Sequence, residues 1–299
     1  MSQANDPRFG RMIPAMITPF DKNREVDYKQ AGALGDRLIG SGADALLVCA
    51  TTGESPTIQW DEKKKVFASV LEASNGRVPV VANVGTNCTA DSVAFAKQAQ
   101  EIGMDGIMAV VPFYNKPPQE GMYQHFKAIA DAIDIPVILY NIPGRCGVNM
   151  EAHTTLRLAR DCANIIAVKE ASGKLDQIKE IIDGAPVGFS IYSGDDSMTY
   201  DVMKLGGDGV ISTTGNIAPA HMKEIVEQCA RGDFDAAMQA HQKLLPLMRE
   251  LFVTSNPILV KESLNIAGFP VGGVRLPLVD ATPEQSQELE SVMREVGAL

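Results

Sequence analysis

The sequence lacks the patterns of a secreted disulfide-linked protein and of a membrane protein. Its five cysteines are odd in number and form no C-x-x-C pair, which argues for reduced thiols and against a disulfide framework. No apolar run approaches the roughly 20 residues that span a bilayer. The first residues, MSQANDPRFGRMIP, contain no apolar segment of the kind found in secretory leaders. We therefore expect a cytoplasmic protein with no membrane partner.

Positive charge and the common ligand-binding motifs are also scarce. The chain carries a formal charge of −10 and no stripe of lysine and arginine, so nucleic acids are poor candidates as partners. The four histidines show no H-E-x-x-H or other metal-ligand spacing. We expect them at surface or helix-capping positions, and we expect no metal site. The phosphate-binding patterns G-x-G-x-x-G and G-x-x-x-x-G-K-[ST] are absent as well.

Short apolar runs, in contrast, recur along the chain. None of them alternates cleanly between apolar and polar residues, which is typical of parallel strands buried on both faces. The runs are MIPAMIT from Met12, ADALLVC from Ala43, VPVVANV from Val78, GIMAVVP from Gly106, IPVILYN from Ile135, NIIAVKE from Asn164, FSIYSG from Phe189 and DGVIST from Asp208.

Helical spacing fills the segments between these runs, as in Met122, Phe126 and Ile129, and we expect Asp61 and Thr89 to cap helices. Eight strand–helix units predict an α/β protein with the (β/α)8 TIM barrel fold. A doubly wound sheet is the alternative, but it usually carries a glycine-rich phosphate turn after its first strand. We assign residues 1–232 to the barrel. Residues 233–299 form a helical C-terminal extension, because strand signals stop there while helical spacing continues.

In a (β/α)8 barrel, the reactive groups lie at the carboxyl ends of the strands. Lys169 ends one predicted strand there, and Tyr140 ends the strand before it. Lys169 could form a structural ion pair, for example with Glu170. It could also be an amine nucleophile, because burial lowers the pKa of a lysine and lets it form a Schiff base with a carbonyl compound. A phenol such as that of Tyr140 can then move protons.

Other polar residues follow the neighbouring strands. The turn ATTGES, residues 50–55, contains Thr51 and Thr52, and it could either cap a helix or bind a carboxylate. Arg145 follows Tyr140 on a loop, where it could be solvated or could grip a second carboxylate. Tyr114 could extend a hydroxyl relay. We expect Asp195 and Asp196 to cap a helix and not to bind a metal.

The segments TTGES, VPFYNKP, YNIPGR, VKEAS and SGDD, in this order, resemble the dihydrodipicolinate synthase / N-acetylneuraminate lyase family of class I aldolases. The resemblance covers nearly the whole chain and includes NPILVK from Asn256. It implies a homotetramer, built as a dimer of dimers, that needs no cofactor beyond a covalent Schiff base between pyruvate and Lys169.

The resemblance also implies roles for individual residues. Tyr140 would be the proton donor and acceptor, in a relay with Thr52 and with Tyr114 from a neighbouring subunit. The carboxylate of pyruvate would be held by the two threonines of the turn. The residues implied for catalysis are Lys169, Tyr140, Thr52, Tyr114 and Thr51, and those implied for substrate binding are Thr51, Thr52, Arg145, Gly194 and Ile211.

Three features resemble the branch of the family that condenses pyruvate with L-aspartate-4-semialdehyde to 4-hydroxy-tetrahydrodipicolinate, on the route to lysine and diaminopimelate. They are the Thr51-Thr52 pair, Tyr114 and Arg145, which would bind the carboxylate of the semialdehyde. An aldolase or dehydratase acting on a keto-deoxy sugar acid or on N-acetylneuraminate is the nearest alternative. A non-catalytic barrel is disfavoured, because it would have no reason to retain a buried amine. Ala50 and Cys146 depart from the usual glycine and threonine, and we expect both changes to affect packing more than chemistry.

Regulation is the last point on which the sequence departs from its relatives. Lysine-inhibited members bind lysine through a tyrosine before the relay tyrosine, an asparagine and a glutamate, and often histidines after TTGES. This chain has Phe113, Asn87 and Asp91 there, with Trp60 and Lys63. The missing phenol and the shorter acid predict weak or absent inhibition by lysine.

Overall fold

The computed structural model describes residues 7–299 and divides them into two compact units. The first unit contains residues 7–11 and Val81–Ile211, and the second contains Met12–Val80 and Ser212–Leu299. The boundary expected at residue 232 stays a prediction. Residues 1–6, on which the expectation about a leader partly rests, lie outside the described residues.

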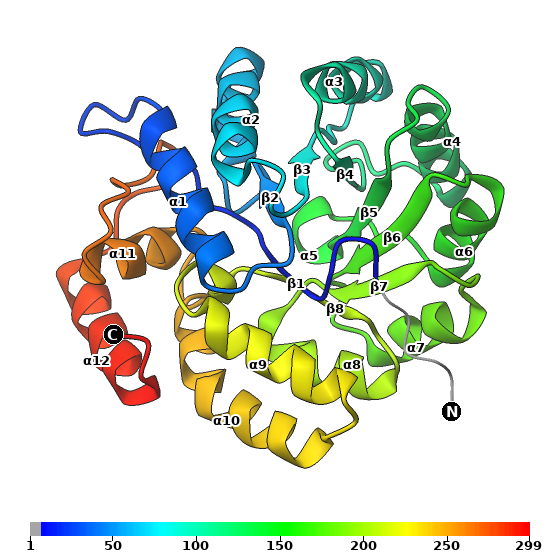
Figure 1. Ribbon diagram of the computed structural model, residues 1–299. Helices are drawn as coiled ribbons and strands as arrows, with labels where there is room; N and C mark the ends of the chain where they lie inside the picture. Colours follow the sequence, from blue (N-terminus) through cyan, green and yellow to red (C-terminus); the bar gives the residue numbers. More distant parts are fainter. Residues whose placement is uncertain (1–6) are drawn as a thin grey trace. The chain divides into compact units, whose positions relative to one another are not determined.

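The strands follow the predicted apolar runs. They are β1 Met12–Pro14, β2 Leu46–Val48, β3 Val80–Asn83, β4 Gly106–Val110, β5 Val137–Asn141, β6 Ile165–Glu170, β7 Ser190–Ser193 and β8 Gly209–Ser212. They form one eight-stranded sheet in the order β1-β8-β7-β6-β5-β4-β3-β2. The two ends of this order are also joined, because Ala15 and Leu47, which directly follow β1 and lie in β2, form a parallel bridge. Together with the helices that alternate with the strands (Figure 1), this order confirms the (β/α)8 class.

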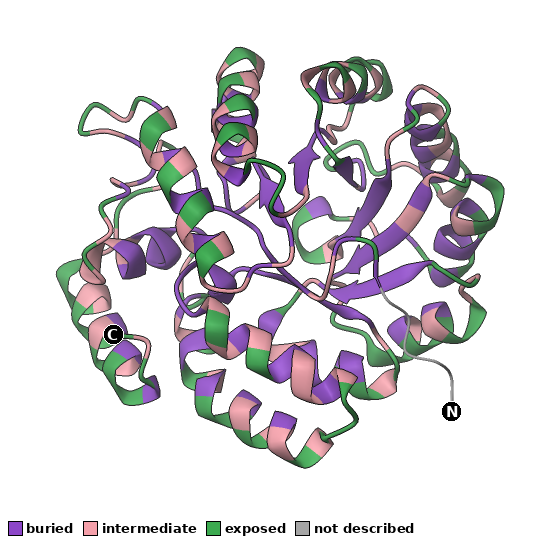
Figure 2. Ribbon diagram, in the orientation of Figure 1, coloured by how far each residue is buried: buried purple, intermediate pink, exposed green. Residues whose placement is uncertain are grey.

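The first unit contains the parallel ladder from β3 to β8. Its helices are α3 Thr89–Ile102, α4 Gln119–Ala130, α5 Pro143–Cys146, α6 Ala152–Asp161, α7 Leu175–Gly184 and α8 Thr199–Leu205, with a 3₁₀ turn η2 at Asp196–Met198. The strands are almost completely buried (Figure 2), as their continuous apolar sequences require.

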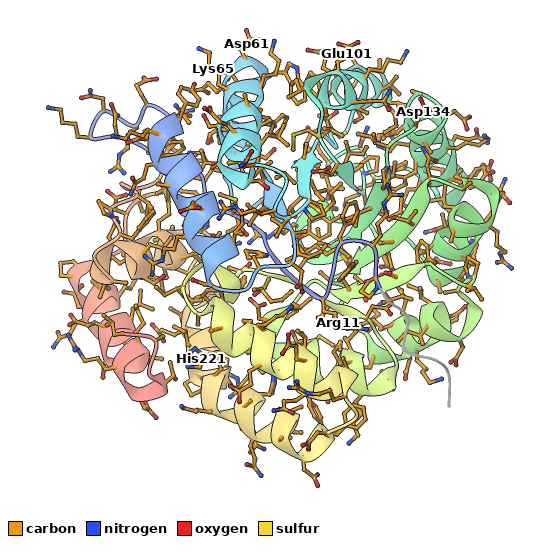
Figure 3. The ribbon with its side chains drawn as sticks, viewed as in Figure 1. Arg11, Asp61, Lys65, Glu101, Asp134 and His221 are labelled. Carbon is orange, nitrogen blue, oxygen red and sulfur yellow. The ribbon has the colours of Figure 1, made fainter. Side chains whose placement is uncertain are left out.

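The second unit contains β1, β2 and the C-terminal helices. Its helices are α1 Tyr28–Gly40, α2 Trp60–Ser74, α9 Pro219–Ala230, α10 Phe234–Glu250, α11 Ile258–Ile266 and α12 Pro283–Val296, with 3₁₀ turns η1 Ser55–Thr57 and η3 Thr214–Asn216. The expected helical extension after residue 233 is therefore present as α10, α11 and α12. Charged residues such as Asp61 and Lys65 project from the outer side of α2 (Figure 3).

Helix starts differ from expectation by one or two residues. The N-cap of α2 is Gln59, which forms a capping box with Glu62, and the N-cap of α3 is Cys88. Asp61 lies inside the first turn of its helix, where its charge favours the helix dipole. Several residue types satisfy the free N–H groups of a first turn, so a single polar residue does not define the cap position.

The prediction that all four histidines lie at surface or capping positions is wrong for His125 and His241, which are buried. His125 Nδ1 lies 2.9 Å from Thr89 Oγ1, and burial lowers the pKa of His125 to about 4. Within residues 7–299, no group of three or more histidine, cysteine or acidic side chains has a metal-binding arrangement. No helix in the same range is long and apolar enough to cross a membrane.

Candidate active site

Lys169 and Tyr140 lie side by side at the carboxyl ends of β6 and β5. The parallel register pairs the two residues directly, and paired residues on neighbouring strands point to the same face of a sheet. The Lys169 Nζ atom lies 4.5 Å from the centre of the Tyr140 ring. Both residues are buried, with exposed fractions of 4% and 3%. The amine and the phenol that the sequence places on neighbouring strands are therefore close enough to act on the same substrate.

Burial gives Lys169 an unusual protonation equilibrium. Desolvation lowers the pKa of Lys169 to about 8, and the nearby Asp196 carboxylate opposes part of this shift. The Arg145 guanidinium lowers the same pKa further. A sizeable fraction of the amine is thus neutral near physiological pH, as a nucleophilic amine requires.

Gly194 leaves the space that the Lys169 side chain needs. A Cβ atom at Gly194 would lie 3.2 Å from Lys169 Cε and 2.7 Å from Ala171 Cβ. The next residue, Asp195, accepts a hydrogen bond from Ser197 N and caps the 3₁₀ turn η2, as expected. The companion Asp196 is buried, and its charge acts on Lys169.

Arg145 lies in the one-turn helix α5 and not on an irregular loop, and it is exposed. Its neighbour Cys146 is buried. Burial raises the pKa of the Cys146 thiol to about 11, so this thiol is protonated at neutral pH and a poor nucleophile.

The opposite face of β5 and β6 carries a network of amides around Glu170. The Glu170 carboxylate accepts hydrogen bonds from Asn141 Nδ2 at 3.1 Å, Ser172 N at 2.8 Å and Gln177 Nε2 at 3.3 Å. Asn141 also accepts from Met150 N at 3.0 Å. The network therefore connects the ends of β5 and β6, which carry Tyr140 and Lys169, to Met150. Arg145 lies in the segment between Asn141 and Met150. The ion pair between Lys169 and Glu170 that the sequence left open does not form, since the two side chains point to opposite faces.

Tyr114 lies in the segment after β4 and is 88% exposed. Its φ angle is +71°, and Lys116 in the same segment has φ +45°. Two non-glycine residues in left-handed conformations within three positions are uncommon. This backbone conformation accompanies a Tyr114 side chain that is exposed in this chain.

The turn after β2 holds Thr52 in a buried position, 2% exposed. Asn256 Nδ2 donates a hydrogen bond to Thr52 Oγ1 over 2.9 Å, and Thr213 Oγ1 lies 3.4 Å from the same oxygen. Thr51 is half-buried. Thr18 Oγ1 donates to the backbone oxygen of Gly53 over 2.7 Å. The hydroxyl-rich turn is thus held by side chains and not only by its own backbone.

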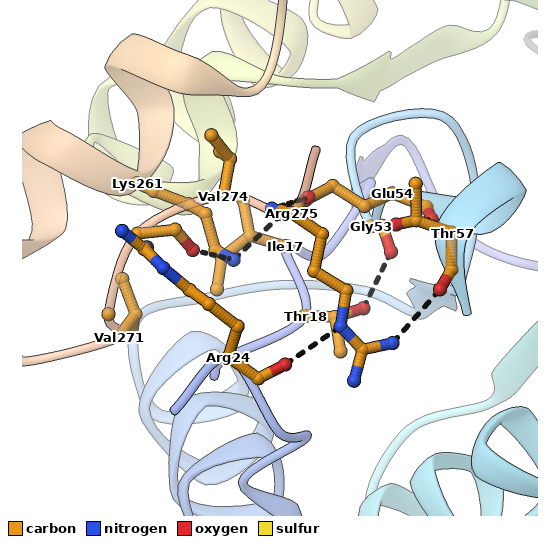
Figure 4. Close-up of polar contacts among 12 residues, drawn as sticks. Ile17, Thr18, Arg24, Gly53, Glu54, Thr57, Lys261, Val271, Val274 and Arg275 are labelled. Carbon is orange, nitrogen blue, oxygen red and sulfur yellow. Dashed lines mark hydrogen bonds and ion pairs between the residues drawn. The ribbon is translucent and has the colours of Figure 1, made fainter. Parts of the chain in front are cut away.

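Glu54 anchors the end of this turn through a buried ion pair (Figure 4). Lys261 Nζ lies 2.7 Å from Glu54 Oε1, and both side chains are 1% exposed. The backbone N–H of Arg275 donates to Glu54 Oε2 over 2.9 Å. Arg275 also binds the Glu62 carboxylate through both terminal nitrogens. Residues of the C-terminal segment therefore hold the ATTGES turn at Thr52 and at Glu54.

The expected site residues are distributed over both units. Lys169, Tyr140 and Gly194 come together in the first unit. Arg145 lies in the same unit and lowers the pKa of Lys169 through its charge. Tyr114 is exposed there, and Ile211 is buried in β8. Thr51 and Thr52 lie in the second unit. The sequence assigns no role to the partners Asn256 and Lys261, although both lie in the segment NPILVK. Lys261 had a detectable signal, as a charged residue after three apolar residues in the first turn of α11.

These features define the class of protein: a (β/α)8 protein with a desolvated lysine and a phenol at adjacent strand ends, as in Schiff-base lyases. The family model of the dihydrodipicolinate synthetase family matches residues 8–296. The chain belongs to this family, as the five sequence segments had indicated.

Individual relatives are similar over nearly the whole chain. The 4-hydroxy-tetrahydrodipicolinate synthase 1 of Halalkalibacterium halodurans is 51% identical, over 94% of this chain and 95% of the relative. The 4-hydroxy-tetrahydrodipicolinate synthase of Symbiobacterium thermophilum is 47% identical, over 98% and 100%. A crystal structure of the enzyme from Cyanidioschyzon merolae with lysine bound is 42% identical, covers 97% of this chain and 99% of that one, and has a TM-score of 0.96.

Proposed function

We propose that this protein catalyses the condensation of pyruvate with L-aspartate-4-semialdehyde to 4-hydroxy-tetrahydrodipicolinate, in lysine and diaminopimelate biosynthesis. The observation that carries the proposal is the direct pairing of Lys169 with Tyr140, with the pKa of the buried lysine lowered to about 8. Relatives at 51% and 47% identity bear the name of this activity.

The reaction begins when the neutral amine of Lys169 attacks the C2 carbonyl of pyruvate. Tyr140 donates a proton to the new hydroxyl group, which leaves as water and gives an iminium ion. Loss of a proton from C3 gives an enamine, and its C3 adds to the aldehyde carbon of the semialdehyde. The amino group of the semialdehyde then adds to C2, the ring closes, and Lys169 is released as an amine. No step in this sequence needs a metal or a bound cofactor.

The remaining residues bind and orient the substrates in this proposal. Thr51 and Thr52 hold the carboxylate of pyruvate, and Thr52 also passes protons. Arg145 binds the carboxylate of the semialdehyde, for which a planar guanidinium is suited. Gly194 and Ile211 line the pocket, and the space that Gly194 leaves beside Lys169 Cε supports its part.

The assembly belongs to the proposal too. We assign Tyr114 to the relay of a neighbouring subunit, in a homotetramer built as a dimer of dimers located in the cytoplasm. The 88% exposure of the Tyr114 side chain supports this assignment, because a phenol that served its own subunit would be expected to be covered.

The test is turnover of pyruvate with L-aspartate-4-semialdehyde by the parent protein and by Lys169→Ala. We expect rapid product formation that the substitution abolishes. If pyruvate is trapped on Lys169 by borohydride but the semialdehyde does not react, the activity is that of a sugar-acid aldolase. If pyruvate is not trapped at all, the Schiff-base mechanism is wrong.

A further inference from the structure

The hydrogen bond between Asn256 and Thr52 constrains the direction in which the Thr52 hydroxyl can point. A hydroxyl has one proton to donate and two lone pairs that accept, whereas an amide nitrogen only donates. Asn256 Nδ2 lies 2.9 Å from Thr52 Oγ1. The Thr52 oxygen therefore accepts on this side, and its proton must be directed elsewhere.

We propose that Asn256 is a positioning residue for proton transfer: by donating to Thr52 Oγ1, it orients the Thr52 hydroxyl so that its proton stays available to the relay. This inference rests on the proposed function, in which Thr52 passes protons. Asn256 acts through Thr52 and need not touch the substrate.

The Glu54–Lys261 pair holds this contact in place. Asn256 lies two residues before α11, Lys261 is within α11, and Glu54 lies two residues after Thr52. The same two segments are therefore joined twice, once through the Asn256 amide and once through the buried ion pair in Figure 4. Such a pair is sensitive to geometry, because a displaced partner would leave a buried charge uncompensated.

The rest of the turn leaves little room for movement. A Cβ atom at Gly53 would lie 2.9 Å from Met16 O. The Gly53 backbone oxygen is held by Thr18 Oγ1. The backbone next to Thr52 is thus held in place, and this restricts the position of Thr52 Oγ1 relative to Asn256.

The stability of the fold does not explain why position 256 carries an amide, because the amide oxygen is left unpaired. Asn256 is 6% exposed, and its Oδ1 atom has no hydrogen-bond partner among residues 7–299. An unpaired buried polar atom carries an energetic cost, because it has lost its hydrogen bonds to water. A role in which only the Nδ2 donor matters accounts for an amide at this position, where an apolar side chain would avoid this cost.

The first experiment compares Asn256→Asp with the parent. The substitution keeps the shape but removes the donor, so Thr52 would turn its proton toward the new carboxylate. We expect exchange of the C3 protons of pyruvate in D2O, followed by NMR, to slow by about 10- to 100-fold. The extent of borohydride trapping of pyruvate on Lys169 at equilibrium should equal that of the parent, since the amine is unchanged.

Asn265→Asp is the matched control, because Asn265 lies in α11, the helix that follows Asn256, and donates through Nδ2 to Gly272 O over 3.1 Å. It should exchange protons at the parental rate. Parental exchange in Asn256→Asp would overturn the inference, as would an equal loss in Asn265→Asp. Absence of pyruvate trapping in the parent would instead overturn the proposed function itself.

A second experiment covers the case in which Asn256→Asp does not fold. The rate of exchange of the C3 protons of pyruvate is compared between Asn256→Ala, Thr52→Val and the double variant. If Asn256 acts through Thr52, the double variant is no slower than Thr52→Val alone. Losses that multiply in the double variant would show that the two residues act independently and would contradict the inference.

Discussion

At the scale of single residues, the central feature is a lysine whose surroundings disfavour its charged form. Lys169 is buried at a strand end, beside an aromatic ring and opposite a carboxylate. Desolvation is the largest influence, and it lowers the pKa to about 8. The residue thus combines the two properties that an amine nucleophile needs, a neutral fraction and a fixed position.

The rate of pyruvate trapping should therefore rise with pH and level off above about pH 8. Asp196→Asn removes a charge that favours the ammonium form, so we expect the midpoint to move down by about one unit. Arg145→Gln removes a like charge and should move the midpoint up. Borohydride trapping measured from pH 6 to 10 gives each midpoint. A midpoint that is unchanged in both variants would show that these charges do not control Lys169.

The same shift makes a prediction about stability. The folded protein binds this proton with a pKa of about 8 and the unfolded chain with the ordinary value of 10.5. The free energy of unfolding is therefore lowered below pH 8, where both states bind the proton, and it rises as the pH increases to about 10.5.

Lys169→Met removes that penalty, and we expect the variant to be more stable than the parent at pH 7 by an amount of order 3 kcal/mol. The advantage should shrink toward pH 10. Urea unfolding at pH 7 and at pH 10 measures both values. A variant less stable than the parent at pH 7 would mean that the ammonium is better compensated than its burial indicates.

At the scale of elements, alternate residues of β5 and β6 have different tasks. Tyr140 and Lys169 face one side, and Asn141 and Glu170 face the other. The first pair carries the chemistry, and the second pair fastens the strand ends to the following segments. A buried carboxylate that accepts only from neutral donors is a structural centre of these segments.

Glu170→Leu should lower the free energy of unfolding by about 3 kcal/mol, because the donors of Asn141, Ser172 and Gln177 would lose their acceptor. Lys179→Ala is the control, since it breaks only an exposed ion pair with Asp183 and should cost less than about 0.5 kcal/mol. Chemical denaturation measures both. Equal losses in the two variants would refute the structural role of the Glu170 network.

At the scale of the whole molecule, the proposed relay extends beyond one chain. The Tyr114 segment uses left-handed backbone conformations at two non-glycine positions to present an exposed phenol. Such local strain persists where the surrounding structure or a partner requires it. This observation makes the assembly testable through activity.

Mixing Lys169→Ala with Tyr114→Phe provides that test. Each variant alone should be nearly inactive. Co-refolded hybrids should regain activity, because one site in a hybrid pair combines an intact Lys169 with an intact Tyr114 from its neighbour. Turnover before and after co-refolding is the measurement. Full activity of Tyr114→Phe alone would remove Tyr114 from the mechanism.

Regulation by lysine gives a second prediction at this scale. Lys63 is buried, and its Nζ atom donates to Ser55 Oγ over 2.7 Å, so a cationic side chain already lies beside the turn. With Phe113 and Asp91 in place of a tyrosine and a glutamate, we expect weak or absent inhibition by L-lysine. Initial rates measured across a lysine titration decide this point, and an inhibition constant in the micromolar range would contradict it.

Much of this architecture could be predicted from local sequence. Continuous apolar runs are sufficient to indicate buried parallel strands, and all eight were located. The last residues of each run then fall at a strand end, which is why Lys169 and Tyr140 could be identified. Helix caps were displaced, because several residues can satisfy the same N–H groups. His125 and His241 were misplaced, since burial depends on neighbours that are distant in sequence.

The sequence by itself determined the fold class and the identity of the reactive groups, because both depend on hydrophobic period and on residue chemistry. Only the tertiary structure decided the interactions between segments far apart in the chain. Asn256 meets Thr52 across 204 residues, and Lys261 meets Glu54 across 207. No local pattern encodes such pairs, since they depend on how complete elements pack. The partners that orient the reactive hydroxyl therefore become visible only after the chain has folded.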